Sequence, residues 1–130
     1  MIVVDASVLV DVVLHIGATD AVKARLLSSD ETVHVPHLID LEVMQVLRRR
    51  AAGGLLLPSR GRMAIDDLTS LPLLRHSHDF LLPRVWELRD NISAYDAVYV
   101  ALAEYRGVPL ITRDRRLANA PGHYAQIDLI

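Results

Sequence analysis

The sequence predicts an α/β protein, a three-layer α/β/α sandwich around a central and mostly parallel sheet. Short apolar runs alternate with longer segments of helical periodicity along all 130 residues, and this order is typical of a parallel sheet covered by helices on both faces. No internal repeat, low-complexity tract or linker interrupts the alternation. A chain of this length buries roughly two thirds of its unfolded surface as one unit. We therefore predict a single domain over residues 1–130.

Each element has its own local signal. Runs rich in valine, isoleucine and leucine predict strands over residues 2–4, 32–35, 73–76, 108–112 and 125–130. Apolar spacing of three and four predicts helices over residues 5–15, 19–27, 37–52, 59–70, 79–89, 93–106 and 115–119. Thr19 or Asp20 is the expected N-cap of the second helix, and Ser93 that of the sixth. Pro36 is expected to stop the second strand, and Gly53 the third helix.

Composition narrows the class of protein. The chain has no cysteine, which excludes disulfides and thiolate metal sites and fits a reducing compartment. No stretch is long and apolar enough to cross a bilayer, and no basic signal peptide begins the chain. We therefore expect a soluble cytoplasmic protein without membrane contact. The formal net charge of −2 argues against an overall basic nucleic-acid binder, although Arg113, Arg115 and Arg116 form a local cluster.

Two aspartates follow predicted strands. Asp5 comes directly after Ile2–Val4, and Asp114 follows the strand predicted over residues 108–112. In an open α/β sheet, ligands bind beyond the carboxyl ends of the strands. Either aspartate alone has a simpler interpretation as the N-cap of the next helix. Two of them in corresponding positions favour a shared site.

Two further acids share helix faces with apolar residues. Glu42 lies four residues after Leu38 and four before Val46, and Asp96 lies four residues before Val100. A buried ion pair with an arginine is the alternative for either residue alone. Four other acids have plausible solvent-facing positions, namely Asp11, Asp40, Glu87 and Glu104.

Asp5, Glu42, Asp96 and Asp114 together, which we call the acidic quartet, indicate a site for a hard divalent cation. Two carboxylates about 5 Å apart repel by roughly 3 kcal/mol at an effective dielectric constant near 20. Bound Mg²⁺ or Mn²⁺ converts that repulsion into attraction, because hard cations prefer oxygen ligands. The hydroxyl groups of Ser7 and Thr112 are candidates for orienting these ligands.

Other catalytic motifs are missing from the sequence. It contains no G-x-x-x-x-G-K-[ST], no G-x-G-x-x-G and no G-x-S-x-G. Residues 5–7 lack the second aspartate of a D-x-D phosphatase motif, and the six histidines show no zinc spacing on a shared helix. His76 and His78 are interpreted as part of a surface loop. The acidic quartet is therefore the strongest catalytic candidate.

Four segments carry a family resemblance, in the family's order. They are V-V-D-A-S-V-L-V at residues 3–10, I-D-L-E-V at 39–43, S-A-Y-D-A-V-Y-V-A-L-A at 93–103 and L-I-T-R-D-R-R-L at 110–117. Each is weak alone, but together they closely resemble the PIN-domain ribonucleases that act as VapC-type toxins of toxin–antitoxin pairs. The resemblance extends over essentially the whole chain.

The resemblance implies an endoribonuclease that depends on Mg²⁺ or Mn²⁺ and cleaves RNA by metal-activated water. The family's catalytic and metal-binding acids fall on Asp5, Glu42, Asp96 and Asp114, and its polar positions on Ser7 and Thr112. A homodimer, a cognate antitoxin and a higher assembly with that antitoxin are the implied partners. No metal role is assigned to Asn119.

As a hypothesis, Asp5, Glu42 and Asp96 hold a first ion, and Asp114 helps to bind a second ion or positions the attacking water. Arg113, Arg115 and Arg116 are expected to guide the RNA backbone, because phosphate contacts dominate nucleic-acid affinity. Two alternatives stay open: a PIN-like nuclease for structured DNA, and a regulatory binding module that does not use its acids.

Overall fold

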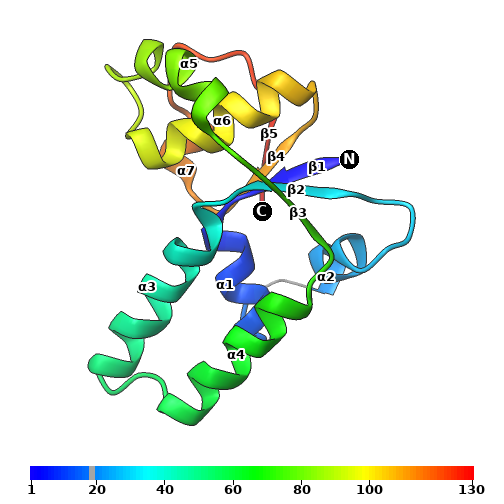
Figure 1. Cartoon of the computed structure of the whole chain (residues 1–130), viewed down its shortest axis with the longest axis vertical. Helices are drawn as coiled ribbons and strands as arrows, with labels where there is room; N and C mark the ends of the chain where they lie inside the picture. The colour runs from blue at the N-terminus through cyan, green and yellow to red at the C-terminus, as the bar shows by residue number, and fades with distance from the viewer. Residues whose placement is uncertain (18–19) are drawn as a thin grey trace.

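Five parallel strands form the central sheet of the protein, whose computed structural model describes residues 1–17 and 20–130 (Figure 1). The strands are β1 (Ile2–Val4), β2 (Val33–Pro36), β3 (Leu73–His76), β4 (Leu110–Thr112) and β5 (Ile127–Leu129). Their order across the sheet is β3-β2-β1-β4-β5. Every neighbouring pair is parallel, so the predicted fold class is confirmed.

The strand order reverses between β1 and β4. The chain runs outward from β1 through β2 to β3, then returns to the other side of β1 with β4 and continues to β5. Val4 pairs with Ile111 in this central ladder, so the two strands end at the same level. Such a reversal opens a crevice at the carboxyl ends of the two strands, where α/β proteins bind ligands. Asp5 and Asp114 lie beside this crevice.

Helices cover both faces of the sheet. They are α1 (Ala6–Leu14), α2 (Asp20–Leu26), α3 (Ile39–Ala52), α4 (Pro58–Ser70), α5 (Leu82–Glu87), α6 (Ala94–Arg106) and α7 (Arg115–Ala118), with a 3₁₀ turn at Asp79–Leu81. Figure 1 shows α1, α3 and α4 on one side of the strands and α5 and α6 on the other. Within the described ranges, no helix is long and apolar enough to cross a membrane.

The core lies around β1 and α6. All three residues of β1 are fully buried, as expected for the central strand of a sheet covered on both faces. Helix α6 is buried continuously from Ala97 to Ala103, because it packs on β1, β2 and β4 at once. This rigid centre fixes the positions of Asp5 and Asp96.

Several predicted boundaries differ from the structure, for example the starts of α3, β4 and β5, each of which begins two residues later than predicted. Pro36 belongs to β2 as its last residue, where a missing N–H is tolerated at the end of a strand. The helix predicted over residues 79–89 is divided into the 3₁₀ turn and α5, with Pro83 in the first turn of α5. Helix α2 begins at Asp20, and the predicted cap Thr19 lies outside the described residues.

Two acids predicted to face solvent are buried instead. The side chain of Asp11 is 6% exposed and contacts the Arg113 guanidinium. The side chain of Glu104 is 2% exposed, and it accepts hydrogen bonds from Arg84 at 2.7 and 3.0 Å. Each arginine comes from a distant part of the chain. Periodicity within one helix therefore could not reveal either pair.

Candidate functional site

Asp5 directly follows β1, Asp114 is the second residue after β4, and each caps the helix that follows. Asp5 accepts a hydrogen bond from the Val8 amide at 3.2 Å, which makes it the N-cap of α1. Asp114 accepts from the Arg116 amide at 2.8 Å and caps α7. The capping interpretation is therefore correct for both residues. It also explains how their carboxylates are fixed beside the crevice.

Ser7 and Thr112 hold the Asp5 carboxylate by both of its oxygens. The Ser7 hydroxyl donates to Oδ1 at 2.5 Å, and the Thr112 hydroxyl donates to Oδ2. Thr112 Oγ1 also accepts from the Asp114 amide at 2.9 Å. The side chain of Thr112 thus links the two strand-end aspartates. Asp5 is only 6% exposed, and its burial raises the pKa of its carboxyl group against these lowering hydrogen bonds.

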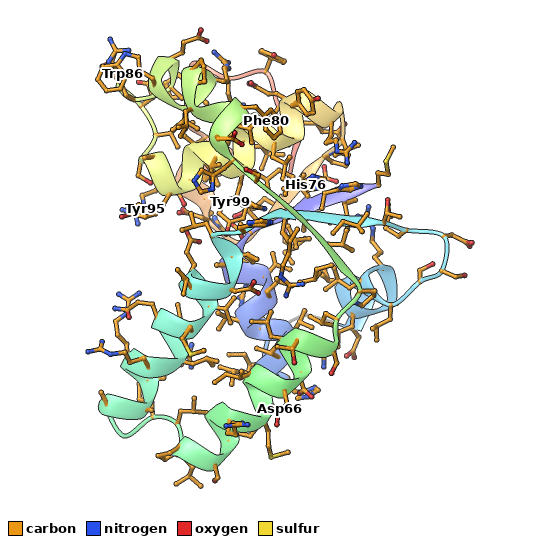
Figure 2. All side chains as sticks on the ribbon, in the orientation of Figure 1. Asp66, His76, Phe80, Trp86, Tyr95 and Tyr99 are labelled. Atoms are coloured by element: carbon orange, nitrogen blue, oxygen red, sulfur yellow. The ribbon has the colours of Figure 1, made fainter. Side chains whose placement is uncertain are left out.

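Glu42 and Asp96 approach the same crevice from helices on opposite faces of the sheet. The Tyr99 hydroxyl of α6 donates to Glu42 Oε2 of α3 at 3.0 Å, and Figure 2 shows Tyr99 between the upper helices and the strands. Ser93 donates to Asp96 Oδ2 at 3.1 Å. Burial raises the pKa of Glu42 to about 7, opposed by the Tyr99 hydrogen bond and assisted by the charges of Asp96 and Asp5. Burial raises the pKa of Asp96 too, and Asp114 adds to that rise.

The four carboxylates share one electrostatic environment, and three of them form no ion pair with a basic residue of the described chain. Asp5, Glu42 and Asp96 form no ion pair among the residues that the structure describes. Asp114 has a loose one, because Arg116 Nε lies 3.9 Å from its Oδ1 on a side chain that is 96% exposed. The alternative of a separate arginine for Glu42 or Asp96 is therefore wrong. An excess of negative charge stays at this edge of the sheet.

This oxygen-only set fits a hard divalent cation. As the side chains stand in the described residues, no three acids or histidines close on a common point. Mg²⁺ does not need such a cage, since it is commonly held by one or two carboxylates, several waters and the phosphates of a substrate. Asp5, Glu42, Asp96 and Asp114 are the residues that could hold the ion.

A hollow of about 350 Å³ opens beside two members of the quartet. Its wall includes the carboxylates of Asp96 and Asp114, together with Asn91, Ser93 and Arg116. Ile92 and Leu117 contribute apolar surface. The hollow therefore brings together carboxylate oxygens, the guanidinium of Arg116 and an apolar wall.

The three arginines near Asp114 do not share one environment. Arg115 and Arg116 are exposed at the start of α7. Arg113 pairs with the buried Asp11, and its side chain is 42% exposed. That the three arginines guide RNA stays a prediction.

The polar residues that hydrogen-bond to the quartet could be predicted from the sequence only in part. Ser7 and Thr112 were predicted beside the acids, and the structure places both on Asp5. Tyr99 and Asp11 were missed as polar residues near the site. Tyr99 lies one helical turn after Asp96, which was the available signal. Its partner Glu42, 57 residues away in the chain, was not predictable from spacing.

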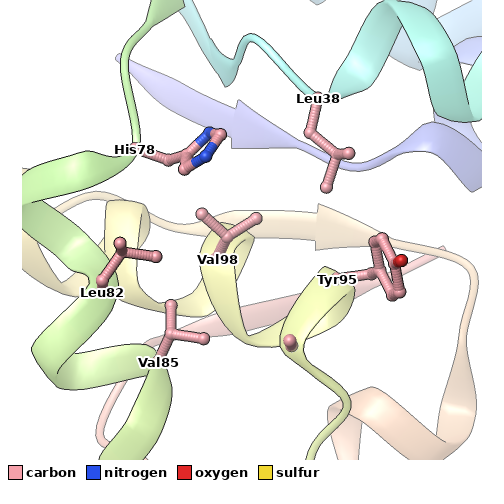
Figure 3. A pocket seen from close by; sticks show the side chains of 7 residues that line it. Leu38, His78, Leu82, Val85, Tyr95 and Val98 are labelled. Carbon is pink, nitrogen blue, oxygen red and sulfur yellow. The ribbon is translucent and has the colours of Figure 1, made fainter.

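An apolar pocket of about 170 Å³ lies between α5 and α6, outside the quartet (Figure 3). Leu82, Val85 and Val98 converge in it, and Leu38 and Tyr95 line its other side. Its lining includes no carboxylate. The pocket is lined by His78 but by no acid, so it lacks the oxygen ligands that a hard divalent cation requires.

His76 belongs to β3, as the strand predicted over residues 73–76 implies, and not to a surface loop; only His78 lies in the exposed loop that follows. His76 ends β3, and its ring stacks on His34 with the centroids 5.0 Å apart. His34 Nδ1 and His76 Nε2 are 2.8 Å apart, and Arg106 approaches His34 at 3.2 Å. Burial, followed by the charge of Arg106, lowers the pKa of both rings. The two histidines thus form a neutral structural pair.

The raised pKa of Glu42 predicts a pH-dependent stability of the metal-free protein. Its folded pKa is about 7, and its ordinary value is 4.5. Because the folded state then binds the proton more tightly, stability is greatest below pH 4.5 for this group and falls as the pH rises to 7. Glu42→Gln should remove that fall, and it should raise stability at pH 8 by about 1–2 kcal/mol after allowance for solvent screening. Urea titrations in EDTA at pH 5 and pH 8 measure the free energy of unfolding of wild type and Glu42→Gln. The same change in this free energy between the two pH values in both proteins would contradict the prediction.

Comparison with known proteins identifies the family. The profile of the PIN domain matches residues 2–122. The chain belongs to the PIN-domain family. Among curated members, Ribonuclease VapC9 of Mycobacterium tuberculosis is 44% identical over 119 residues, which cover 92% of this chain and 90% of the relative. Ribonuclease VapC12 of the same organism is 41% identical over 130 residues, covering 100% of this chain and 99% of the relative.

Solved PIN-domain structures have the same architecture. PAE2754 from Pyrobaculum aerophilum superimposes with a TM-score of 0.70 at 28% identity, covering 98% of this chain and 83% of that one. A chain of VapBC2 from Rickettsia felis, solved bound to a promoter DNA fragment, gives 0.73 at 14% identity, with coverage of 99% and 98%. The second likeness is one of fold alone.

Proposed function

We propose that this protein is the ribonuclease toxin of a toxin–antitoxin pair, and that it uses the acidic quartet to hold Mg²⁺ or Mn²⁺. Its PIN-domain relatives at 41–44% identity are named VapC ribonucleases. The decisive observation is the group of carboxylates at the sheet's switch point, three of which form no ion pair with a basic residue of the described chain. A cation and an RNA phosphate together complete such a site.

Each residue of the site has a separate task. Asp5 is the most rigid ligand, because Ser7 and Thr112 fix both of its oxygens. Glu42 is held by the Tyr99 hydroxyl, and burial raises the pKa of Tyr99 so that it stays a donor. Asp96 completes the first set, and Asp114 faces the hollow as the ligand of a second ion or the acceptor that orients water. When bound, the ion supplies Lewis-acid polarisation of the phosphodiester and a water of lowered pKa.

The hollow beside Asp96 and Asp114 is the proposed place of the RNA strand. Arg116 at its rim attracts the backbone, since phosphate contacts supply most of the affinity for nucleic acids. The apolar side of Ile92 and Leu117 suits the face of an unpaired base. In-line attack of water on phosphorus would leave 5′-phosphate and 3′-hydroxyl ends.

The proposed protein partners are a second copy of the chain and a cognate antitoxin that blocks the acids. The alternative of a nuclease for structured DNA is weaker, because the PIN-domain relatives that match almost the whole chain are named ribonucleases. A regulatory module without catalysis has no need of unpaired buried carboxylates, which are costly to keep.

RNA digestion tests the activity directly. Purified protein incubated with total RNA and Mn²⁺ should produce discrete fragments with 5′-phosphate ends, and the same reaction in EDTA should produce none. Mapping the fragment ends by sequencing measures both results. Cleavage that persists in EDTA would contradict the metal mechanism, whereas cleavage of flap DNA but not RNA would favour the DNA alternative.

Mn²⁺ should stabilise the wild-type protein through the same carboxylates. Saturating MnCl₂ at one hundred times Kd contributes about 2.7 kcal/mol to the folded state, so we expect a clear rise in melting temperature. Asp96→Asn should be more stable than wild type without metal, because one repelling charge is gone, and should gain much less from Mn²⁺. Differential scanning fluorimetry measures both. An equal gain in the two proteins would exclude Asp96 from the metal site.

A further inference from the structure

Asp11 is a buried carboxylate outside the quartet, and the proposed mechanism does not use it. It lies on α1, and its side chain is 6% exposed. Its Oδ2 contacts Nη1 of Arg113, whose side chain is 42% exposed. A buried carboxylate is strongly destabilising without such a partner. Within the described residues, the Arg113 guanidinium therefore pairs with Asp11 and with no member of the quartet.

The backbone of Gly17 closes over this ion pair. Gly17 has φ +73°, and a Cβ built on it would contact Asp11 Oδ2 and lie 2.9 Å from Arg113 Nη1. The Ile16 amide donates to the Asp11 carbonyl at 3.0 Å, which ties this turn to the end of α1. The turn at Gly17 therefore packs closely against the ion pair on one side, while the Arg113 side chain stays 42% exposed.

The backbone of Arg113 is fixed at the edge of the proposed metal site. Its amide donates to Ser7 Oγ at 3.1 Å, and the Ser7 hydroxyl donates to Asp5 Oδ1 at 2.5 Å. Asp114 is the next residue in the chain. A guanidinium released at this point would be drawn to the uncompensated carboxylates, because arginine binds carboxylates in a bidentate and charge-assisted way. It would then compete with a metal ion.

We propose that Asp11 is a positioning residue that keeps the Arg113 guanidinium away from Asp5 and Asp114, so that their oxygens are available to a divalent cation. This inference rests on the proposed metal-dependent function and assigns to it a residue that touches neither the ion nor RNA. It accounts for an arginine beside an acidic site that leaves the acids unneutralised. It also gives Gly17 a task, since its backbone packs against the pair.

The decisive measurement is the Mn²⁺ affinity of variants of Asp11 and Arg113. It is made by isothermal titration calorimetry with MnCl₂ in the absence of RNA. Asp11→Asn releases Arg113 and should weaken Mn²⁺ binding roughly tenfold, since a positive charge then lies within a few ångströms of the ligands. Asp11→Asn combined with Arg113→Gln should restore the wild-type Kd to within about twofold, because the competing charge is gone. Arg113→Gln alone should also keep the wild-type Kd, although it leaves Asp11 unpaired and lowers stability.

The outcomes separate positioning from mere structural support. If Asp11→Asn lowers the melting temperature but leaves the Mn²⁺ Kd unchanged, or if the double variant binds as weakly as Asp11→Asn, the positioning role is overturned while the metal mechanism stands. Wild-type protein that binds no Mn²⁺ would overturn both proposals. Should Asp11→Asn fail to fold, Gly17→Ala provides a second test, because its Cβ must displace the pair. Weaker Mn²⁺ binding that Arg113→Gln reverses supports the role, and unchanged binding contradicts it.

Discussion

Replacing Asp96 with asparagine should lower the rate of RNA cleavage about a thousandfold. The substitution keeps the size of the side chain and its contact with Ser93, but it removes one negative charge from the centre of the quartet. The negative charge of Asp96 contributes to the raised pKa of Glu42 and of Asp5, and the charge of Asp114 contributes to the raised pKa of Asp96. Removal of a group that stabilises charge in the transition state typically costs two to three orders of magnitude. Single-turnover cleavage of an RNA substrate in Mn²⁺ measures the loss.

Asp90→Asn is the matched control for this experiment. Asp90 has an 80% exposed side chain and lies 4.0 Å from Arg89, so the same chemical change there should alter the rate by less than about twofold. Comparable rates for wild type and Asp96→Asn would refute the catalytic role of the quartet. A loss in both variants would point to a general charge effect on RNA binding, which a shift in KM would reveal.

Replacing Glu104 with glutamine should destabilise the fold by about 2–4 kcal/mol, because it leaves a partly buried arginine without its main partner. Arg84 of α5 donates to both oxygens of Glu104 on α6, and the Tyr124 amide donates to Oε1 at 3.0 Å. Burial opposes ionisation of Glu104, but Arg84 and the Tyr124 amide together lower the pKa of its carboxyl group. The stabilisation is therefore full above the ordinary glutamate pKa and is lost as the pH falls through the lowered value. Urea unfolding at pH 7 measures the change.

The same arginine provides an internal control. Arg84 Nη1 also pairs with Glu87 at 2.9 Å, but that carboxylate is 63% exposed. Glu87→Gln should cost less than about 0.5 kcal/mol, because solvent screens an exposed pair. Similar losses for the two variants would show that burial of Glu104 does not control the strength of the pair.

The fold class was predictable because it depends on local patterns. The strand Ile2–Val4 and the helix from Ala94 to Arg106, with Ser93 and Gly107 as its caps, lie where apolar spacing and capping residues predict them. The helix predicted over residues 79–89 was wrong in detail, because the structure divides it into a 3₁₀ turn and α5, which begins at Leu82 with Pro83 in its first turn.

The part of the site that depends on residues close in sequence was also predictable. Asp5 and Asp114 could be placed at one edge of the sheet, because both follow strands that run in the same direction. Ser7 and Thr112 could be placed beside them, because they are sequence neighbours of those aspartates. The role of Tyr99 could not, since its hydroxyl meets Glu42 only after α3 and α6 pack against the sheet.

The sequence by itself determined which segments form strands and helices and which four acids stand at their ends and inner faces. Periodicity and capping act within a few residues, so they are readable along the chain. Only the tertiary structure decided which carboxylates receive a cation: Asp11 has Arg113, Glu104 has Arg84, and Asp5, Glu42 and Asp96 have none within the described residues. Ion pairing depends on distances between elements far apart in sequence, which exist only once the sheet has formed.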